Sequence, residues 1–135
     1  MKIVKVAAAI LFFGNKILLT KRQQGKDYAG MWEFPGGKLE NYETFKQALQ
    51  RELFEELGLK VLEQNLEPYY YDEFVDGKKQ QINIEFYLCK NYENIPESKE
   101  QQEIAYFAIK DITDLKMPPA DIGVLQKIAL DFGYY

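Results

Sequence analysis

The chain has 135 residues, 47% of them hydrophobic and 28% charged, which excludes a disordered protein and suffices for a single domain, residues 1–135, with one core. A net charge of −4 excludes bulk attraction for nucleic acid or anionic membranes, so an anionic substrate has to be received locally, most simply through a divalent cation. The absence of histidine excludes imidazole chemistry, and a lone Cys89 excludes an internal disulfide, which suits a reducing cytoplasm.

Two apolar runs open the chain. Residues 4–13 form a continuous run of strand length, and residues 16–21 follow across Gly14-Asn15, which predicts a β-hairpin. The run at 6–13 superficially resembles a signal peptide, but a turn and a second apolar run follow it instead of a cleavage-like site. We therefore expect strand-turn-strand, and because no segment is long enough to span a bilayer we expect no membrane partner.

The middle of the chain alternates loops with periodic segments. Residues 22–38, RQQGKDYAGMWEFPGGK, are expected to be a loop because they contain four glycines and Pro35. Residues 44–57 have a helical period and stop at Gly58. Residues 69–74 and 81–89 are predicted strands, and the alternation in the second of them predicts one buried face.

The last third begins with a polar loop at residues 93–103. We expect a strand at 104–109, a turn or short helix near Asp111, and a final helix from about Asp121. The residues at helical spacing along that final helix are Ile122, Leu125, Ala129 and Phe132. The order of strands, helix, strands and helix predicts an α+β fold built on a mixed sheet.

The predicted helix at 44–57 gathers carboxylates on one face. On a helical wheel Glu52, Glu55 and Glu56 share an arc with Arg51, next to apolar residues that should face inward. One interpretation is a solvated face with ion pairs from Arg51 to Glu55 and from Glu56 to Lys60. However, Glu52 and Glu56 repel each other, more so if partly buried. A divalent cation reverses that repulsion, because closely placed carboxylates are the ligands that Mg²⁺ selects.

The same segment resembles the Nudix box at every fixed position, from Gly37 through Glu43 to the run RELFEELGL at residues 51–59. The resemblance implies an α/β/α sandwich with a mixed sheet and hydrolysis of nucleoside diphosphates linked to another moiety. WEFPGGKLE and PPAD, elsewhere in the chain, are similar to the MutT-type branch of nucleoside triphosphate pyrophosphohydrolases. Such enzymes cut NTP to NMP and pyrophosphate by water attack, with Mg²⁺ or Mn²⁺.

The resemblance also assigns roles to individual residues. Glu52 and Glu56 match the principal metal ligands, Glu55 assists them, and the carbonyl of Gly36 matches a backbone ligand. A further glutamate is expected from a loop after the box, and Glu100 fits that position.

Other residues are implied to support these ligands. Arg51 would orient the glutamates, Glu43 in particular. Glu103 is the alternative to Glu100 as the loop glutamate. A carboxylate, either Glu52 or the loop glutamate, would take a proton from the attacking water, since the chain has no histidine.

Asp121 departs from the MutT-type pattern at a position that concerns recognition of the nucleobase. The MutT-type enzyme specific for 8-oxo-guanine nucleotides has asparagine here, which both donates and accepts, whereas ionised aspartate only accepts. Aspartate would accept from the N4 amino group of cytosine, from N1–H and N2 of guanine, or from N7–H of an 8-oxo-purine. PAD also resembles the CTP pyrophosphohydrolase branch. The alternative is that Asp121 caps the last helix.

Three aromatic side chains lie near the base by resemblance. Trp32, Phe34 and Tyr28 would stack on a base or pack in the core, with packing favoured for Phe34. Arg22 would touch base or phosphate, or stay at the surface. The aromatic run at 69–74 offers a stacking platform, although packing is the safer interpretation.

The leading hypothesis is a MutT-like pyrophosphohydrolase acting on 8-oxo-dGTP or other oxidised dNTPs. The alternative substrates are CTP, dCTP or modified cytosine nucleotides. A non-catalytic nucleotide-binding module is remote because the glutamates and Arg51 are intact, and an RNA 5′-end pyrophosphatase would need a basic track. We expect a small-molecule nucleotide as partner, no stable nucleic-acid partner, a cytoplasmic location, and a monomer with a dimer left open.

Overall fold

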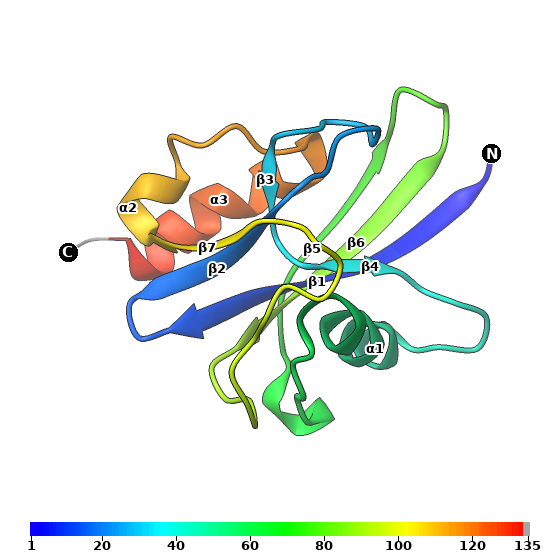
Figure 1. Ribbon diagram of the computed structural model, residues 1–135. Coiled ribbons are helices and arrows are strands. Elements are labelled where there is room, and N and C mark those ends of the chain that lie inside the picture. The colour runs from blue at the N-terminus through cyan, green and yellow to red at the C-terminus, as the bar shows by residue number, and fades with distance from the viewer. Residues whose placement is uncertain (134–135) are drawn as a thin grey trace.

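The computed structural model describes residues 1–133, and its centre is a seven-stranded mixed sheet (Figure 1). The elements in chain order are β1 (Ile3–Phe13), β2 (Lys16–Lys21), β3 (Trp32–Glu33), β4 (Gly36–Lys38), α1 (Phe45–Leu57), η1 (Glu63–Asn65), β5 (Glu67–Val75), β6 (Gln81–Cys89), β7 (Ile104–Ala108), α2 (Ile109–Ile112) and α3 (Pro119–Phe132). The strand order is β3-β2-β1-β6-β5, with β4 paired to β1 and β7 paired to β2. Helix α1 covers one face and α2 and α3 cover the other (Figure 1), which confirms the predicted sandwich.

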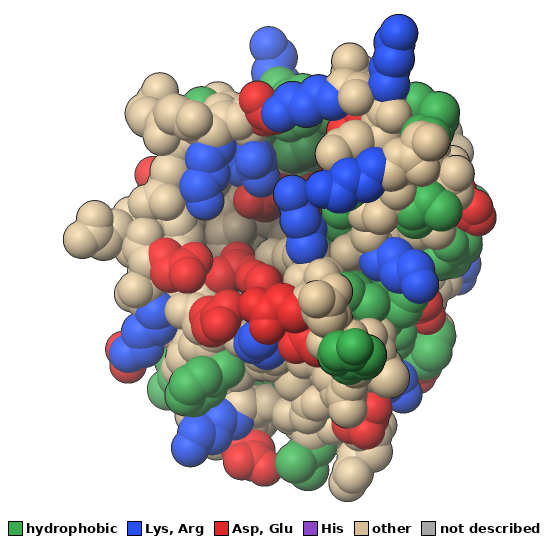
Figure 2. Space-filling model, turned by 90° about the vertical axis from the view of Figure 1, so that its right-hand side faces the viewer, with side chains coloured by type: hydrophobic (Ala, Val, Ile, Leu, Met, Phe, Trp, Pro, Cys, Tyr) green, Lys and Arg blue, Asp and Glu red, His purple; other side chains and the backbone are tan. Residues whose placement is uncertain are grey.

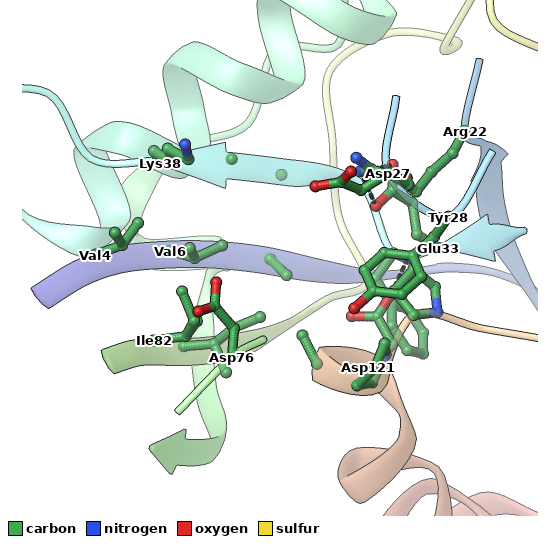
Figure 3. A pocket seen from close by; sticks show the side chains of 18 of the residues that line it. Val4, Val6, Arg22, Asp27, Tyr28, Glu33, Lys38, Asp76, Ile82 and Asp121 are labelled. Carbon is green, nitrogen blue, oxygen red and sulfur yellow. Dashed lines mark hydrogen bonds and ion pairs between the residues drawn. The ribbon is translucent and has the colours of Figure 1, made fainter. Parts of the chain in front are cut away.

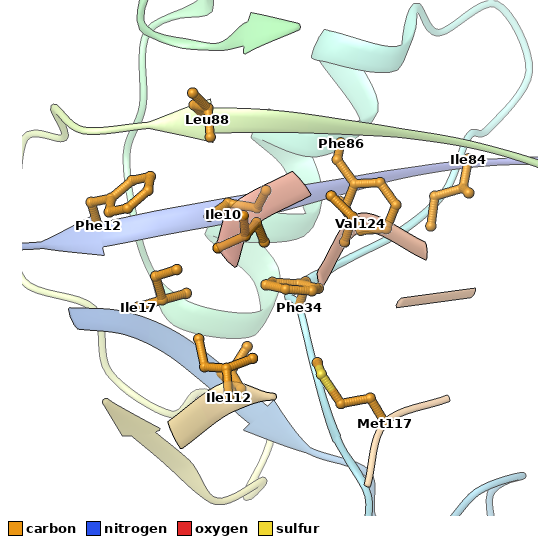
Figure 4. Packing of buried hydrophobic residues seen from close by; sticks show 13 residues of the cluster. Ile10, Phe12, Ile17, Phe34, Ile84, Phe86, Leu88, Ile112, Met117 and Val124 are labelled. Atoms are coloured by element: carbon orange, nitrogen blue, oxygen red, sulfur yellow. The ribbon is translucent and has the colours of Figure 1, made fainter. Parts of the chain in front are cut away.

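Strand β1 is buried at every position from Ala7 to Phe12, so both of its faces are apolar there. Its even-numbered residues from Ala8 to Phe12 join the core beneath α2 and α3 (Figure 4), and its odd-numbered residues from Ala7 to Leu11 join the core beneath α1. Strand β6 runs parallel to β1 and lies beside it in the sheet. The prediction of one buried face is therefore incomplete for β6, since Tyr87 and Cys89 are buried on the side of α1.

Helix α1 begins and ends where its sequence signals place it. Thr44 accepts the N–H of Gln47 at 3.1 Å, and the Gln47 side chain accepts the N–H of Thr44 at 3.0 Å, which forms a capping box. Gly58 ends the helix in the left-handed region, with a φ of 63°. The apolar side chains that fix the helix on the sheet are Ala48, Leu49, Leu53 and Leu57. Its glutamates are therefore held at the margin of a packed face.

The segment 22–38 was expected to be a loop, and that prediction is wrong for its second half. Strand β3 pairs with β2, and β4 pairs with β1, in antiparallel fashion. Two strands of two and three residues are too short to show any period in the sequence. They exist because longer neighbours supply the hydrogen-bond partners.

The final helix differs from the prediction in its start and its inward face. Helix α3 begins at Pro119, a residue that suits the first turn of a helix, and not at Asp121. Val124 and Ile128 are buried, whereas Ile122 is 54% exposed. No helix within residues 1–133 is long and apolar enough to cross a membrane.

Candidate active site

A pocket of about 670 Å³ lies where the segment 22–38, β1, the β5–β6 hairpin and the start of α3 meet (Figure 3). Figure 2 shows acidic side chains on one lip of a hollow and lysine and arginine side chains across it. The carboxylates that line the pocket are Asp27, Glu33, Glu52, Asp76, Glu56, Glu100 and Asp121, and the cations are Arg22, Lys26, Lys38 and Lys78. The lysines gave no signal in the sequence because they are scattered over the β2–β3 loop, β4 and the β5–β6 hairpin.

Arg51 of α1 connects the glutamates that the sequence singles out. Its Nε and Nη2 donate to the carboxylate of Glu43 at 2.7 and 2.9 Å, and its Nη1 donates to Glu52 at 2.8 Å and to Glu55 at 3.1 Å. The hydrogen bond from Arg51 and, to a smaller extent, the one from the backbone N–H of Glu40 lower the pKa of Glu43 to about 2. Glu43 and Glu55 do not line the pocket, whereas Glu52 does. Arg51 thus holds the side chain of Glu52 in the pocket while it also binds Glu43 and Glu55, which lie outside the pocket.

Glu56 is the carboxylate that this network leaves out. Its Oε2 is buried and has no hydrogen-bond partner within residues 1–133, and the ion pair expected with Lys60 is not among the pairs of that part of the chain. The pKa of Glu56 is raised from its ordinary value of 4.5 to about 10, mainly by burial and secondly by the neighbouring Glu52. A buried carboxyl oxygen without a partner is satisfied by a proton or by a cation. The donor set at this end of the pocket therefore fits a divalent cation.

Two glycines next to this helix are required for different reasons. Gly36 has a φ of 150°, and a Cβ there would collide with the carbonyl oxygen of Ala7 in β1. A Cβ on Gly37 would lie 2.5 Å from Cδ of Glu52, so the carboxylate of Glu52 occupies the space that a side chain would take. Gly36 lets β4 pair closely with β1, and Gly37 leaves room for a functional side chain.

We expect alanine at these two positions to have different effects. Gly36→Ala should lower the free energy of unfolding by more than about 2 kcal/mol, because backbone cannot move aside as a side chain can. Gly37→Ala should cost less than about 1 kcal/mol, since the Glu52 side chain can rotate away, but it should displace that carboxylate. Urea denaturation of both variants measures the difference, and equal losses of stability would contradict the assignment.

The two candidates for the loop glutamate are separated by their positions. Glu100 lines the pocket, whereas Glu103 lies outside it and pairs with Lys21 at 3.9 Å. The buried side chain of Gln102 donates to the carbonyl of Glu56 at 3.0 Å and accepts the N–H of Glu100 at 3.0 Å. Gln102 thus ties the loop to α1, and it was missed because nothing distinguishes it within a polar run.

Asp121 lies at the other end of the pocket. It is buried, and its Oδ2 accepts the N–H of Phe34 at 3.3 Å. The helix cap is Pro118, so the interpretation of Asp121 as an N-cap is wrong. Burial, followed by the charge of Glu33, raises the pKa of Asp121 well above its ordinary value. A protonated Asp121 donates one hydrogen bond and still accepts others, which brings it closer to asparagine than its identity implies.

Arg22 and Glu33 form the wall beside Asp121. Nη1 of Arg22 donates to Glu33 at 3.0 Å, and its Nε donates to the carbonyl of Asp27 at 2.5 Å. Burial, opposed by Arg22, raises the pKa of Glu33. Glu33 was not singled out, because only the fold brings it next to Asp121.

The aromatic candidates also differ in whether they pack in the core or line the pocket. Phe34 is 4% exposed and packs edge-on against Phe86, with ring centroids 5.7 Å apart, so the packing interpretation holds for it. Trp32 packs edge-on against Phe107 at 5.0 Å and does not line the pocket. Tyr70, in the run at 69–74, also packs on Phe86. Of the three side chains expected near a base, Tyr28 is half-exposed and lines the pocket.

The sequence of this chain is similar to those of known proteins. The NUDIX domain model matches residues 3–128. The CTP pyrophosphohydrolase of Escherichia coli (strain K12) is 34% identical over 126 residues, which cover 93% of this chain and 91% of that protein. The 8-oxo-dGTP diphosphatase of Haemophilus influenzae is 38% identical over 129 residues, which cover 94% of this chain and 92% of that protein.

The fold of this chain is similar to those of solved structures. The solution structure of the E. coli ORF135 protein has a TM-score of 0.84 at 32% identity and covers 97% of this chain and 92% of that one. A MutT structure from work on Aliivibrio salmonicida and Vibrio cholerae has a TM-score of 0.82 at 30% identity and covers 97% and 100%.

Proposed function

Because this chain belongs to the NUDIX domain family and is a Nudix hydrolase, we propose that it is a divalent-metal-dependent nucleoside triphosphate pyrophosphohydrolase. It would convert an NTP and water into an NMP and pyrophosphate. The observation that carries the proposal is a single pocket with the α1 carboxylates at one end and the buried Asp121 at the other. Relatives named 8-oxo-dGTP diphosphatase and CTP pyrophosphohydrolase support it.

The metal would lie at the α1 end. We propose Mg²⁺, or alternatively Mn²⁺, held by Glu52 and Glu56 with help from Glu55, Glu100 and the carbonyl of Gly36. The unpartnered Oε2 of Glu56 supports this assignment. Residues 1–133 contain no three acidic or thiol side chains placed to hold an ion by themselves, so phosphate and water oxygens would complete the coordination. When bound, the cation neutralises phosphate charge and lowers the pKa of water.

The protein's own groups would position and deprotonate the attacking water. Glu52, or alternatively Glu100, would accept its proton as it attacks phosphorus. Arg51 keeps Glu52 in place by a 2.8 Å hydrogen bond, and Glu43 holds Arg51 from the opposite side. Lys38 and Lys78, on the pocket wall, would attract the triphosphate.

Asp121 would select the base. In its protonated form it donates and accepts, as the asparagine of MutT-type enzymes does, which supports 8-oxo-dGTP or another oxidised dNTP as substrate. In its ionised form it would accept from the N4 amino group of cytosine. The similarity to the E. coli CTP pyrophosphohydrolase supports CTP, dCTP or modified cytosine nucleotides as the second candidate.

A substrate panel tests both candidates. Pyrophosphate release with Mg²⁺ would be measured for 8-oxo-dGTP, dGTP, CTP, dCTP and 5-methyl-dCTP with the wild type and with Asp121→Asn. We expect kcat/KM for 8-oxo-dGTP to exceed that for dGTP at least about tenfold, and Asp121→Asn to retain that preference. A preference for cytosine nucleotides that Asp121→Asn abolishes would select the second candidate. No turnover of any triphosphate would overturn the proposed function.

We further propose that the chain acts as one domain and as a monomer, in the cytoplasm and without a stable nucleic-acid partner. The net charge of −4 opposes binding to nucleic acid, and the buried, unpaired Cys89 suits a reducing compartment.

A further inference from the structure

The loop between β2 and β3 presents a tyrosine in an unusual conformation. Tyr28 has a φ of 60°, which a bulky side chain rarely adopts. Its side chain is 47% exposed and lies on the pocket wall, next to Glu33 and Asp121 (Figure 3). Strained residues persist where the surroundings over-determine them, and such residues gather at ligand clamps.

The contacts of its neighbours hold Tyr28 in this position. The carbonyl of Tyr28 accepts the N–H of Met31 at 3.1 Å, and the carbonyl of Asp27 accepts Nε of Arg22 at 2.5 Å. The carboxylate of Asp27 pairs with Nζ of Lys78 at 2.9 Å. Lys78 belongs to the β5–β6 hairpin, whose tip lies beside the β2–β3 loop (Figure 1). The Asp27–Lys78 pair thus links the β2–β3 loop to the β5–β6 hairpin at the pocket.

Tyr28 is the most exposed of the three aromatic side chains that line the pocket. Phe34 is buried, and Phe74 packs partly against the core. Across the pocket from Tyr28, Val6 and Ile82 supply an apolar wall (Figure 3). A half-exposed ring, a facing apolar wall and a buried polar group beside them make a slot for a flat heteroaromatic ring with a polar edge.

We propose that Tyr28 stacks on the nucleobase of the substrate and supplies affinity for the base without selecting it. The proposal rests on the proposed function. Stacking tolerates every base because each has a π face, whereas hydrogen bonds to a base edge discriminate. Tyr28 and Asp121 would therefore divide the work, with affinity from the ring and selectivity from the carboxyl group.

The test removes the ring without straining the loop. Glycine adopts positive φ freely, so Tyr28→Gly should fold at least as well as the wild type, and Tyr28→Phe keeps the ring. Tyr42→Gly is a matched control, because Tyr42 has a φ of 69°, is fully exposed and lies outside the pocket. For each variant we would measure kcat and KM for dCTP and dGTP, equilibrium binding of dCMP and dGMP, and inhibition by inorganic pyrophosphate.

For Tyr28→Gly we expect KM and the Kd of both monophosphates to rise by about tenfold, and by the same factor for cytosine and guanine. The values of kcat and of pyrophosphate inhibition should change less than about twofold, since pyrophosphate has no base to stack. Tyr28→Phe and Tyr42→Gly should behave as the wild type.

Three results would overturn the proposal: unchanged nucleotide binding in Tyr28→Gly, an equal loss of pyrophosphate inhibition, or a loss confined to one base. If the wild type hydrolyses no triphosphate, the proposed function fails, and the monophosphate affinities still decide whether Tyr28 stacks on a base.

Discussion

Glu52→Gln is expected to lower kcat for triphosphate hydrolysis by about a thousandfold or more, because the proposed site loses a proton acceptor and a ligand in one substitution. The side chain of Glu52 lies against Gly37, receives Nη1 of Arg51 at 2.8 Å and lines the pocket. Glutamine keeps the shape but accepts no proton at neutral pH and binds a divalent cation weakly. Steady-state pyrophosphate release with saturating Mg²⁺ measures the loss.

Two other substitutions calibrate this effect. Glu55→Gln removes a second carboxylate from Arg51, but Glu55 is half-exposed and outside the pocket, so we expect a loss of only about tenfold. Glu63, in η1, is exposed and does not line the pocket, so Glu63→Gln should leave activity unchanged. If Glu52→Gln kept activity within tenfold of the wild type, the assignment of Glu52 would fail.

The sequence predicted the parts of this fold that are locally determined. Thr44, Gln47 and Gly58 fix the ends of α1 by contacts within a few residues, so its range was predictable. The long apolar runs of β1 and β2 are likewise local signals. The same reasoning explains why the carboxylates of α1 were found from the sequence. Their pattern lies within one helix, and the fold only has to turn it toward a pocket.

Contacts between distant segments were not predictable in this way. The N–H of Phe34 reaches Asp121 across 87 positions, and Gln102 reaches the carbonyl of Glu56 across 46. The pair of Asp27 and Lys78 joins two loop tips that have no periodic pattern. The base end of the pocket is made of such contacts. Its chemistry, including the raised pKa of Asp121, therefore emerges only when the sheet is assembled.

Glu56→Gln is expected to abolish activity and yet to stabilise the metal-free protein above about pH 5. The folded protein holds a proton on Glu56 that the unfolded chain releases near the ordinary value of 4.5, because burial and Glu52 raise the folded pKa to about 10. Between these two pKa values the folded state binds more protons, so stability falls as pH rises. Glutamine carries no charge to bury, and we expect a gain of about 1–2 kcal/mol at pH 8.

Thermal unfolding in EDTA from pH 5 to pH 9 measures this effect, with Glu63→Gln as the exposed control. The wild type should lose stability toward high pH, and Glu56→Gln should lose less. Asp121 contributes a slope of the same sign in both proteins, so the difference between them isolates Glu56. Mn²⁺ or Mg²⁺ should raise the Tm of the wild type most at high pH, where the cation replaces the proton, and should raise that of Glu56→Gln much less. A Glu56→Gln variant less stable than the wild type at pH 8 in EDTA would mean that the carboxyl has a partner other than a proton or a cation.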